Sequence, residues 1–74
     1  MHVEPLNVRY VAVLQVPGGS RLFCSDRQRD EWTSWVSHAE SFGALYEAQQ
    51  VAQRHGGQVL TWADAHKVAA TAVG

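Results

Sequence analysis

The side chains of this 74-residue chain that could carry out covalent chemistry begin with its single cysteine, Cys24. A cysteine nucleophile needs a base within hydrogen-bond reach and a third group that orients that base. Cys24 instead lies between Phe23 and Ser25 in a strand-like stretch, which is typical of a buried structural thiol. Glu40 and Glu47 are separated by a glycine, so we do not expect them to act as an acid–base pair. The sequence predicts a protein that is not an enzyme.

Metal-binding and phosphate-binding motifs are also missing from the sequence. None of the candidate metal ligands has a partner at the spacing of roughly two to five residues used by zinc sites; these ligands are His2, His38, His55, His66 and Cys24. The glycines of "PGGS" at 17–20 are not followed by the Lys-Ser/Thr pair of a phosphate-binding loop, so they indicate a hairpin turn. We expect neither a metal nor a cofactor.

Two of the three tryptophans stand close together in "EWTSWVSHAESF" at 31–42. If residues 28–42 form a helix, Trp32 and Trp35 share an apolar stripe with Val36, Ala39 and Phe42. If the segment is extended, both rings lie over the preceding hairpin. The pattern alone does not decide between these two conformations.

The elements that must position these side chains are two strands, a helix and a third strand. "NVRYVAVLQV" at 7–16 and "RLFCS" at 21–25 predict a hairpin, in which Gly18 takes the positive φ of a type II turn. An apolar face over 44–52 predicts an amphipathic helix, and "HGG" at 55–57 predicts its end.

"QVLTW" at 58–62 predicts a strand that lies parallel to an earlier one, as is usual after a helix that covers a sheet. Thr61 and Asp64 predict a cap for a short C-terminal helix. The expected fold is therefore a single α+β domain over residues 1–74. Its β-β-α-β core covers residues 8–62, and residues 63–74 form a C-terminal extension.

Both faces of the first strand are apolar, because Val11 and Val13 alternate with Tyr10, Ala12 and Leu14. One helix can cover only one face of a sheet. We expect the second face to be covered by the C-terminal segment, by a second copy of the chain in a homodimer, or by a partner protein.

The composition excludes several classes of protein. A formal net charge of −1 argues against a strong non-specific DNA binder and against a carboxylate-covered DNA mimic. One cysteine permits no internal disulfide, no apolar run approaches the ~20 residues of a membrane span, and the first ten residues lack a signal-peptide layout. We expect a cytoplasmic protein that does not contact membranes.

Single-stranded nucleic-acid binding by the hairpin is an alternative. Aromatic side chains can stack on bases while arginines contact phosphates; the residues available are Tyr10, Phe23, Trp32, Arg9, Arg21, Arg27 and Arg29. Acidic residues interrupt the arginines, which makes this alternative weaker than protein binding.

The order of features resembles small orphan proteins of bacteriophages and mobile elements, the kind that includes anti-CRISPR inhibitors. The resemblance lies in the valine-rich strand, the glycine turn, Trp35, Ala39 and Phe42 of "WVSHAESF", the "EA" of the helix and "GGQV" before the last strand. It implies an extended segment before the helix, with Trp35, Ala39 and Phe42 as framework residues that seat the helix on the sheet.

The resemblance further implies a non-enzymatic binder that blocks a host protein or nucleoprotein complex, such as a CRISPR-Cas effector, in the bacterial cytoplasm. Tryptophan and arginine often dominate protein interfaces. We therefore predict partner contacts by Trp32, Trp62, Arg27 and Arg29.

Overall fold

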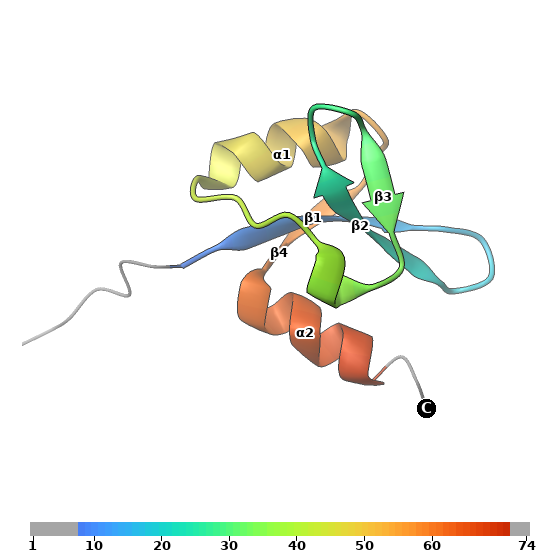
Figure 1. Ribbon diagram of the computed structural model, residues 1–74. Helices are drawn as coiled ribbons and strands as arrows, with labels where there is room; N and C mark the ends of the chain where they lie inside the picture. The colour runs from blue at the N-terminus through green and yellow to red at the C-terminus, as the bar shows by residue number, and fades with distance from the viewer. Residues whose placement is uncertain (1–7, 72–74) are drawn as a thin grey trace, which may run out of the picture.

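The computed structural model describes residues 8–71 and contains a four-stranded sheet, two α-helices and one short 3₁₀ helix (Figure 1). This arrangement confirms the predicted small α+β fold. In chain order the elements are β1 (Tyr10–Gln15), β2 (Arg21–Asp26), β3 (Glu31–Thr33), η1 (Val36–His38), α1 (Leu45–Gln53), β4 (Gln58–Thr61) and α2 (Trp62–Thr71).

The hairpin of β1 and β2 forms as its sequence predicts. Gly18 has a φ of 95°, and the Gly19 N–H donates to the carbonyl oxygen of Val16 at 3.2 Å, which closes the turn. Within the hairpin, Val13 lies opposite Phe23.

The sheet has the order β3-β2-β1-β4, and every neighbouring pair is antiparallel. The prediction that residues 58–62 run parallel to an earlier strand is therefore wrong. Phe42 explains the reversal, because it exchanges backbone hydrogen bonds of 2.8 and 2.9 Å with Tyr10 at the start of β1. The chain thus returns to the start of β1 before α1 begins, α1 runs in the direction of β1, and β4 runs back (Figure 1).

The segment 28–42 is extended rather than helical. It forms β3, one turn of 3₁₀ helix at η1, and then extended backbone at Ala39 before the bridge of Phe42 to β1. The helical alternative is wrong, and the extended conformation that the family resemblance implied is confirmed. The strand β3 is absent from the predicted β-β-α-β core, although a short irregular strand or loop was the form expected for the extended alternative.

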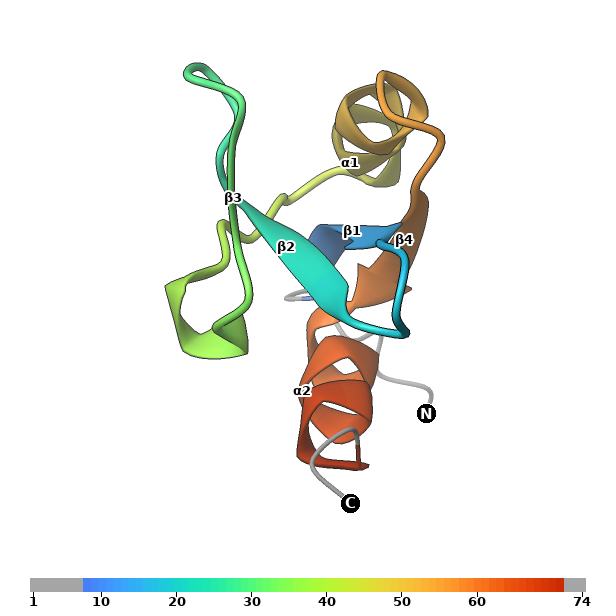
Figure 2. The same cartoon turned by 90° about the vertical axis from the view of Figure 1, so that its right-hand side faces the viewer.

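Two helices cover the two faces of the sheet, so the domain has three layers (Figure 2). Of the alternatives for the second face of β1, the C-terminal segment is the one that covers it. The α1-side cluster consists of Ala12, Cys24, Phe42, Ala48, Val51 and Ala52. The α2-side cluster consists of Val11, Val13, Phe23 and Ala65.

Both helix boundaries that the sequence signalled are observed. α1 ends before Gly56, which has a φ of 69°, and the Gly57 N–H donates to the carbonyl oxygen of Ala52 at 2.8 Å. At the start of α2, the Thr61 hydroxyl accepts the Asp64 N–H at 3.2 Å, as expected for a helix cap. Neither helix of the described part has the length and apolar character needed to cross a membrane.

Candidate functional site

The two clustered tryptophans have the opposite environments to those that the sequence suggested. Trp35 is 67% exposed, although it was predicted to be a framework residue of the core. That prediction is wrong, whereas its companion Phe42 is fully buried as predicted. In extended backbone, residues an odd number of positions apart point to opposite faces. Trp32 therefore packs against the α1-side cluster, whereas Trp35 is not part of that cluster and is exposed.

Trp32 is held by its neighbours rather than presented to solvent. Its side chain is half-buried, and its indole N–H donates to Asp30 Oδ1 at 3.0 Å. The ring of His55 meets it edge to face, with 5.3 Å between the ring centroids. Trp32 thus joins β3 to the end of α1, and replacing it would disturb the fold as well as any contact with a partner.

Asp30 connects these groups at the turn between β2 and β3. Its φ is 57°, a conformation that Asp adopts more readily than most residues. His55 Nε2 lies 2.8 Å from Asp30 Oδ1 and 3.1 Å from Oδ2. Although Asp and His form part of many catalytic triads, His55 has no hydrogen bond to a hydroxyl or thiol in the described part of the chain. The Asp30–His55 pair therefore joins the β2–β3 turn to the turn that follows α1.

The Asp30 carboxylate gives a pH-dependent contribution to stability. Its pKa is lowered from 3.8, mainly because it accepts the Trp32 indole N–H and then because of its hydrogen bond to His55. A lowered pKa means that the stabilisation is complete above the unfolded-state pKa and is lost as pH falls through the folded-state pKa.

We predict that Asp30→Asn lowers the melting temperature at pH 7, and that the difference from wild type shrinks as pH falls below about 4. Asparagine keeps the tolerance for positive φ, so the comparison isolates the charge. Thermal unfolding followed by circular dichroism at pH 7, 5 and 3 checks this; a difference that is independent of pH would rule out the carboxylate as its source.

The Arg27 side chain also makes its contacts within the molecule. Its Nε lies 3.0 Å from Glu40 Oε2, its Nη1 lies 3.4 Å from Glu47 Oε1, and its Cζ lies 4.8 Å from the centre of the Phe42 ring. Its backbone N–H also donates to Glu40 Oε1 at 2.8 Å. Arg27 therefore ties the turn after β2 to the segment before α1 and to α1 itself.

The four predicted contact residues do not form one surface. Trp32, Arg27 and the exposed Arg29 belong to the turn and strand beside α1, whereas Trp62 lies on the α2 side of the sheet. Trp62 is half-buried, and its ring centroid is 4.5 Å from that of His66. Their role in partner binding stays a prediction.

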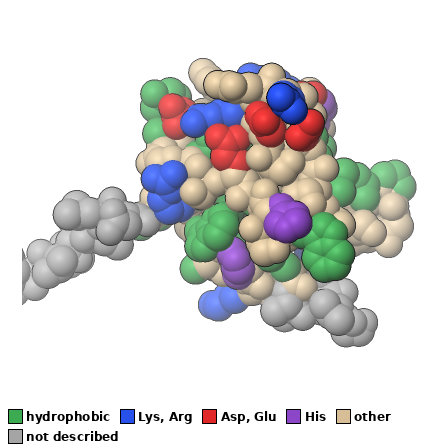
Figure 3. Space-filling model, viewed as in Figure 1, with side chains coloured by type: hydrophobic (Ala, Val, Ile, Leu, Met, Phe, Trp, Pro, Cys, Tyr) green, Lys and Arg blue, Asp and Glu red, His purple; other side chains and the backbone are tan. Residues whose placement is uncertain are grey.

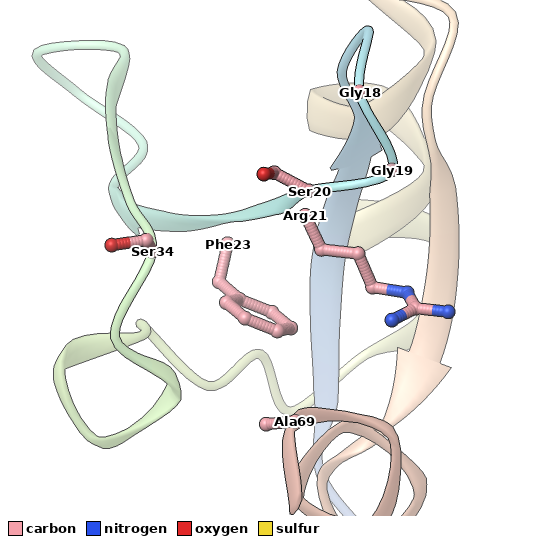
Figure 4. Close-up of a pocket in the computed structure, with 7 residues that line it drawn as sticks. All are labelled: Gly18, Gly19, Ser20, Arg21, Phe23, Ser34 and Ala69. Atoms are coloured by element: carbon pink, nitrogen blue, oxygen red, sulfur yellow. The ribbon is translucent and has the colours of Figure 1, made fainter. Parts of the chain in front are cut away.

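An open hollow lies beside Ser34, the residue that precedes Trp35 in the chain. Ser34 forms one wall of this hollow, which has a volume of about 360 Å³ and lies between the β1–β2 turn and α2. In Figure 4 the Phe23 ring stands between Ser34 and Arg21, with Ala69 of α2 beyond it. The full lining is Gly18, Gly19, Ser20, Arg21, Phe23, Ser34 and Ala69.

We use the name Trp35 surface for four residues that line this hollow together with the exposed Trp35, which follows Ser34 in the chain; the four are Ser20, Arg21, Ser34 and Ala69. Arg21 has no ion-pair partner among residues 8–71, and the two serines offer hydroxyl groups beside an apolar floor. Such a surface suits a partner with an acidic group for Arg21 and an apolar patch for the indole. Figure 3 shows a similar separation of polar and apolar groups on one face of the molecule. Hydrophobic and histidine side chains gather over η1 and α2, and most charges gather over α1 and the β2–β3 turn.

Metal binding and thiol chemistry find little support in the described residues. Within 8–71, no three His, Cys, Asp or Glu side chains are grouped to hold a metal ion, and His2 lies outside this range. Cys24 is fully buried, as predicted; burial and then the charge of Glu40 raise the pKa of its thiol to about 11, which keeps it protonated and unreactive.

The hairpin offers fewer groups for nucleic acid than the sequence suggested. Phe23 is only 2% exposed, so its ring cannot stack on a base. Arg9 donates to Ser41 Oγ at 3.2 Å and to the Ser41 carbonyl oxygen at 3.1 Å, and Arg27 is held by two glutamates.

Comparison of the chain with protein-family models, with curated proteins and with solved structures found no match. The assignment of the candidate site therefore rests on the geometry of this structure alone.

Proposed function

We propose that this protein is a non-enzymatic protein-binding module that contacts its partner through the Trp35 surface. The observation that carries the proposal is the 67% exposure of Trp35. A domain of this size buries only ~60% of the surface of its unfolded chain, so its stability depends on committing large apolar side chains to the core. A tryptophan left outside that core contributes little to folding, and tryptophan is among the residues that most often dominate binding energy.

The chemistry of the Trp35 surface describes the partner. Arg21 favours an acidic group on the partner, and the indole of Trp35 favours an apolar depression beside it. The resemblance to phage and mobile-element proteins supports a host protein or nucleoprotein complex as the partner. A CRISPR-Cas effector is one such complex, and inhibition would follow from occlusion of its surface in the bacterial cytoplasm.

The contacts predicted from the sequence belong to a second, smaller part of the proposal. Arg29 is exposed at the β2–β3 turn and is free to meet a partner that extends to the α1 side. Arg27 and Trp32 have structural roles, so alanine at either position changes folding and binding together. Trp35 is the cleaner position to test.

The experiment is capture from a bacterial lysate by immobilised wild type, Trp35→Ala and Tyr46→Ala. Tyr46 is 63% exposed on α1, which makes Tyr46→Ala a matched loss of an exposed aromatic side chain away from the Trp35 surface. We expect the Tyr46→Ala variant and wild type to retain the same complex and the Trp35→Ala variant to lose it. Equal capture by all three proteins would refute the assignment of the surface.

A further inference from the structure

The two edges of the sheet differ in how well they are protected against pairing with another strand. β3 has three residues, its register with β2 shifts at Cys24 and Asp26, and it begins with the charged Glu31. Short length, irregular register and charge are features that block edge pairing. β4, at the other edge, reads Gln-Val-Leu-Thr and has neither a charge nor a proline.

The backbone groups that β4 turns outward follow from its register with β1. The Trp62 N–H donates to the carbonyl oxygen of Arg9 at 2.8 Å, so residue 62 stands at a hydrogen-bonding position of the β1–β4 ladder. Such positions alternate along an antiparallel ladder. Leu60 and Gln58 therefore also bond toward β1, and Val59 and Thr61 turn their backbone groups to the outside.

Gly57 adds one acceptor to this edge. In a trans peptide the carbonyl points opposite to the next N–H, and the Gln58 N–H points to β1, so the Gly57 carbonyl points outward. The Gly57 N–H is used by the carbonyl oxygen of Ala52, and the Thr61 carbonyl lies at the start of α2, where a cap residue accepts the first helical hydrogen bond.

The outer edge therefore presents four backbone groups that have no partner within residues 8–71: the Gly57 carbonyl, the Val59 N–H, the Val59 carbonyl and the Thr61 N–H. This order of acceptor, donor, acceptor and donor is complementary to itself when the strand is turned through a two-fold axis at Val59.

We propose that β4 pairs with β4 of a second copy of this chain across a two-fold axis at Val59. The two Val59 residues exchange two hydrogen bonds, and each Thr61 N–H donates to the Gly57 carbonyl of the other copy. The two groups already used inside each chain, the Gly57 N–H and the Thr61 carbonyl, fall opposite each other, so neither loses a partner. The result is one continuous eight-stranded sheet, with an isologous interface.

The side chains beside the edge also permit a second copy. A hollow of about 290 Å³ lies between α1 and β4, and Leu45, Gln49 and Gln53 line its helix side. Leu45 is 44% exposed, and neither this row nor β4 carries a charge. Two identical edges can therefore approach without the like-charge repulsion that would oppose self-association.

This inference is independent of the proposed function. It concerns the β4 edge and the hollow beside α1, whereas the hollow of the Trp35 surface lies beside α2. Sedimentation velocity of the full chain over a range of concentrations tests this inference. We expect wild type to sediment as a dimer and the double variant Gln49→Lys, Gln53→Lys to dissociate at least tenfold more readily, since two lysines from each copy would meet at the interface. Gln50→Lys, which adds a charge on α1 outside the hollow, and Trp35→Ala should both dimerise like wild type.

A chemically synthesised chain with an N-methyl group on Val59 provides the second variant, because it removes the central donor and leaves the side chain in place. We expect a folded monomer. A wild-type protein that stays monomeric up to about 1 mM would overturn the proposal and leave this edge to a strand of another protein. A dimer that survives both the lysine pair and N-methylation would equally overturn it, because it must form elsewhere.

Discussion

Replacement of Phe42 by alanine is expected to lower the free energy of unfolding by about 3–5 kcal/mol. Phe42 is fully buried in the α1-side cluster, and its ring also faces the Arg27 guanidinium at 4.8 Å. Domains have roughly 0.05–0.15 kcal/mol of stability per residue, about 4–11 kcal/mol for a chain of this length. Phe42→Ala therefore removes a large part of the total and leaves a substantial unfolded population.

Urea denaturation followed by circular dichroism measures this loss. Tyr46→Ala is the control, because it removes an aromatic ring of similar size that is 63% exposed. We expect the Tyr46→Ala midpoint to stay close to that of wild type. If both variants lost stability equally, the burial of Phe42 would not be what anchors the segment before α1.

The second large effect is expected at Gly57. A Cβ atom built at this position would lie 2.4 Å from the carbonyl oxygen of Val13 and 2.7 Å from Leu14 Cδ2. The first of these atoms belongs to the backbone of β1, so Gly57→Ala must move β4 away from the strand that it pairs with. We expect a loss of about 3 kcal/mol, at the upper end of the usual cost of overpacking.

Gly56→Ala separates this steric effect from backbone conformation. A Cβ at Gly56 meets nothing within 4 Å, but its φ of 69° lies in the left-handed region. That change should cost only about 1–2 kcal/mol. Urea midpoints of the two variants decide the matter: a smaller loss for Gly57→Ala than for Gly56→Ala would show that β1 and β4 are not packed as tightly as described.

The elements that could be predicted from the sequence are those whose signals are local. The alternation of Val11, Ala12 and Val13 specifies a strand, Gly18 specifies the hairpin turn, and Gly56 specifies the end of α1. The cap at Thr61 likewise predicted α2. Each of these signals acts within a few residues, so it needs no knowledge of the rest of the fold.

The direction of β4 could not be predicted in the same way. It depends on the bridge between Phe42 and Tyr10, which are far apart in the chain and return it to the start of β1 before α1 begins. The usual rule for a strand after a helix assumes a crossover from the end of the preceding strand. In this protein the extended segment that ends at Phe42 already brings the chain back to the start of β1, so no crossover is left for α1 to make.

The environments of the two clustered tryptophans were mispredicted for a related reason. Trp32 and Trp35 share a face in a helix but take opposite faces in extended backbone, so the conformation of this one segment decides which ring is buried. The odd spacing was the available signal. The hollow beside Ser34 had no signal in the sequence, because Arg21, Ser34 and Ala69 come from three distant parts of the chain.

The most direct test of the proposed function is the affinity of Trp35→Ala for the purified complex that wild type captures, measured by isothermal titration. A dominant contact contributes at least about 2 kcal/mol, which corresponds to a Kd increase of roughly thirtyfold. We expect that increase together with an unchanged melting temperature, because the Trp35 side chain is mostly exposed. A Trp35→Ala protein that binds with the affinity of wild type would contradict the proposal that this surface is the binding site.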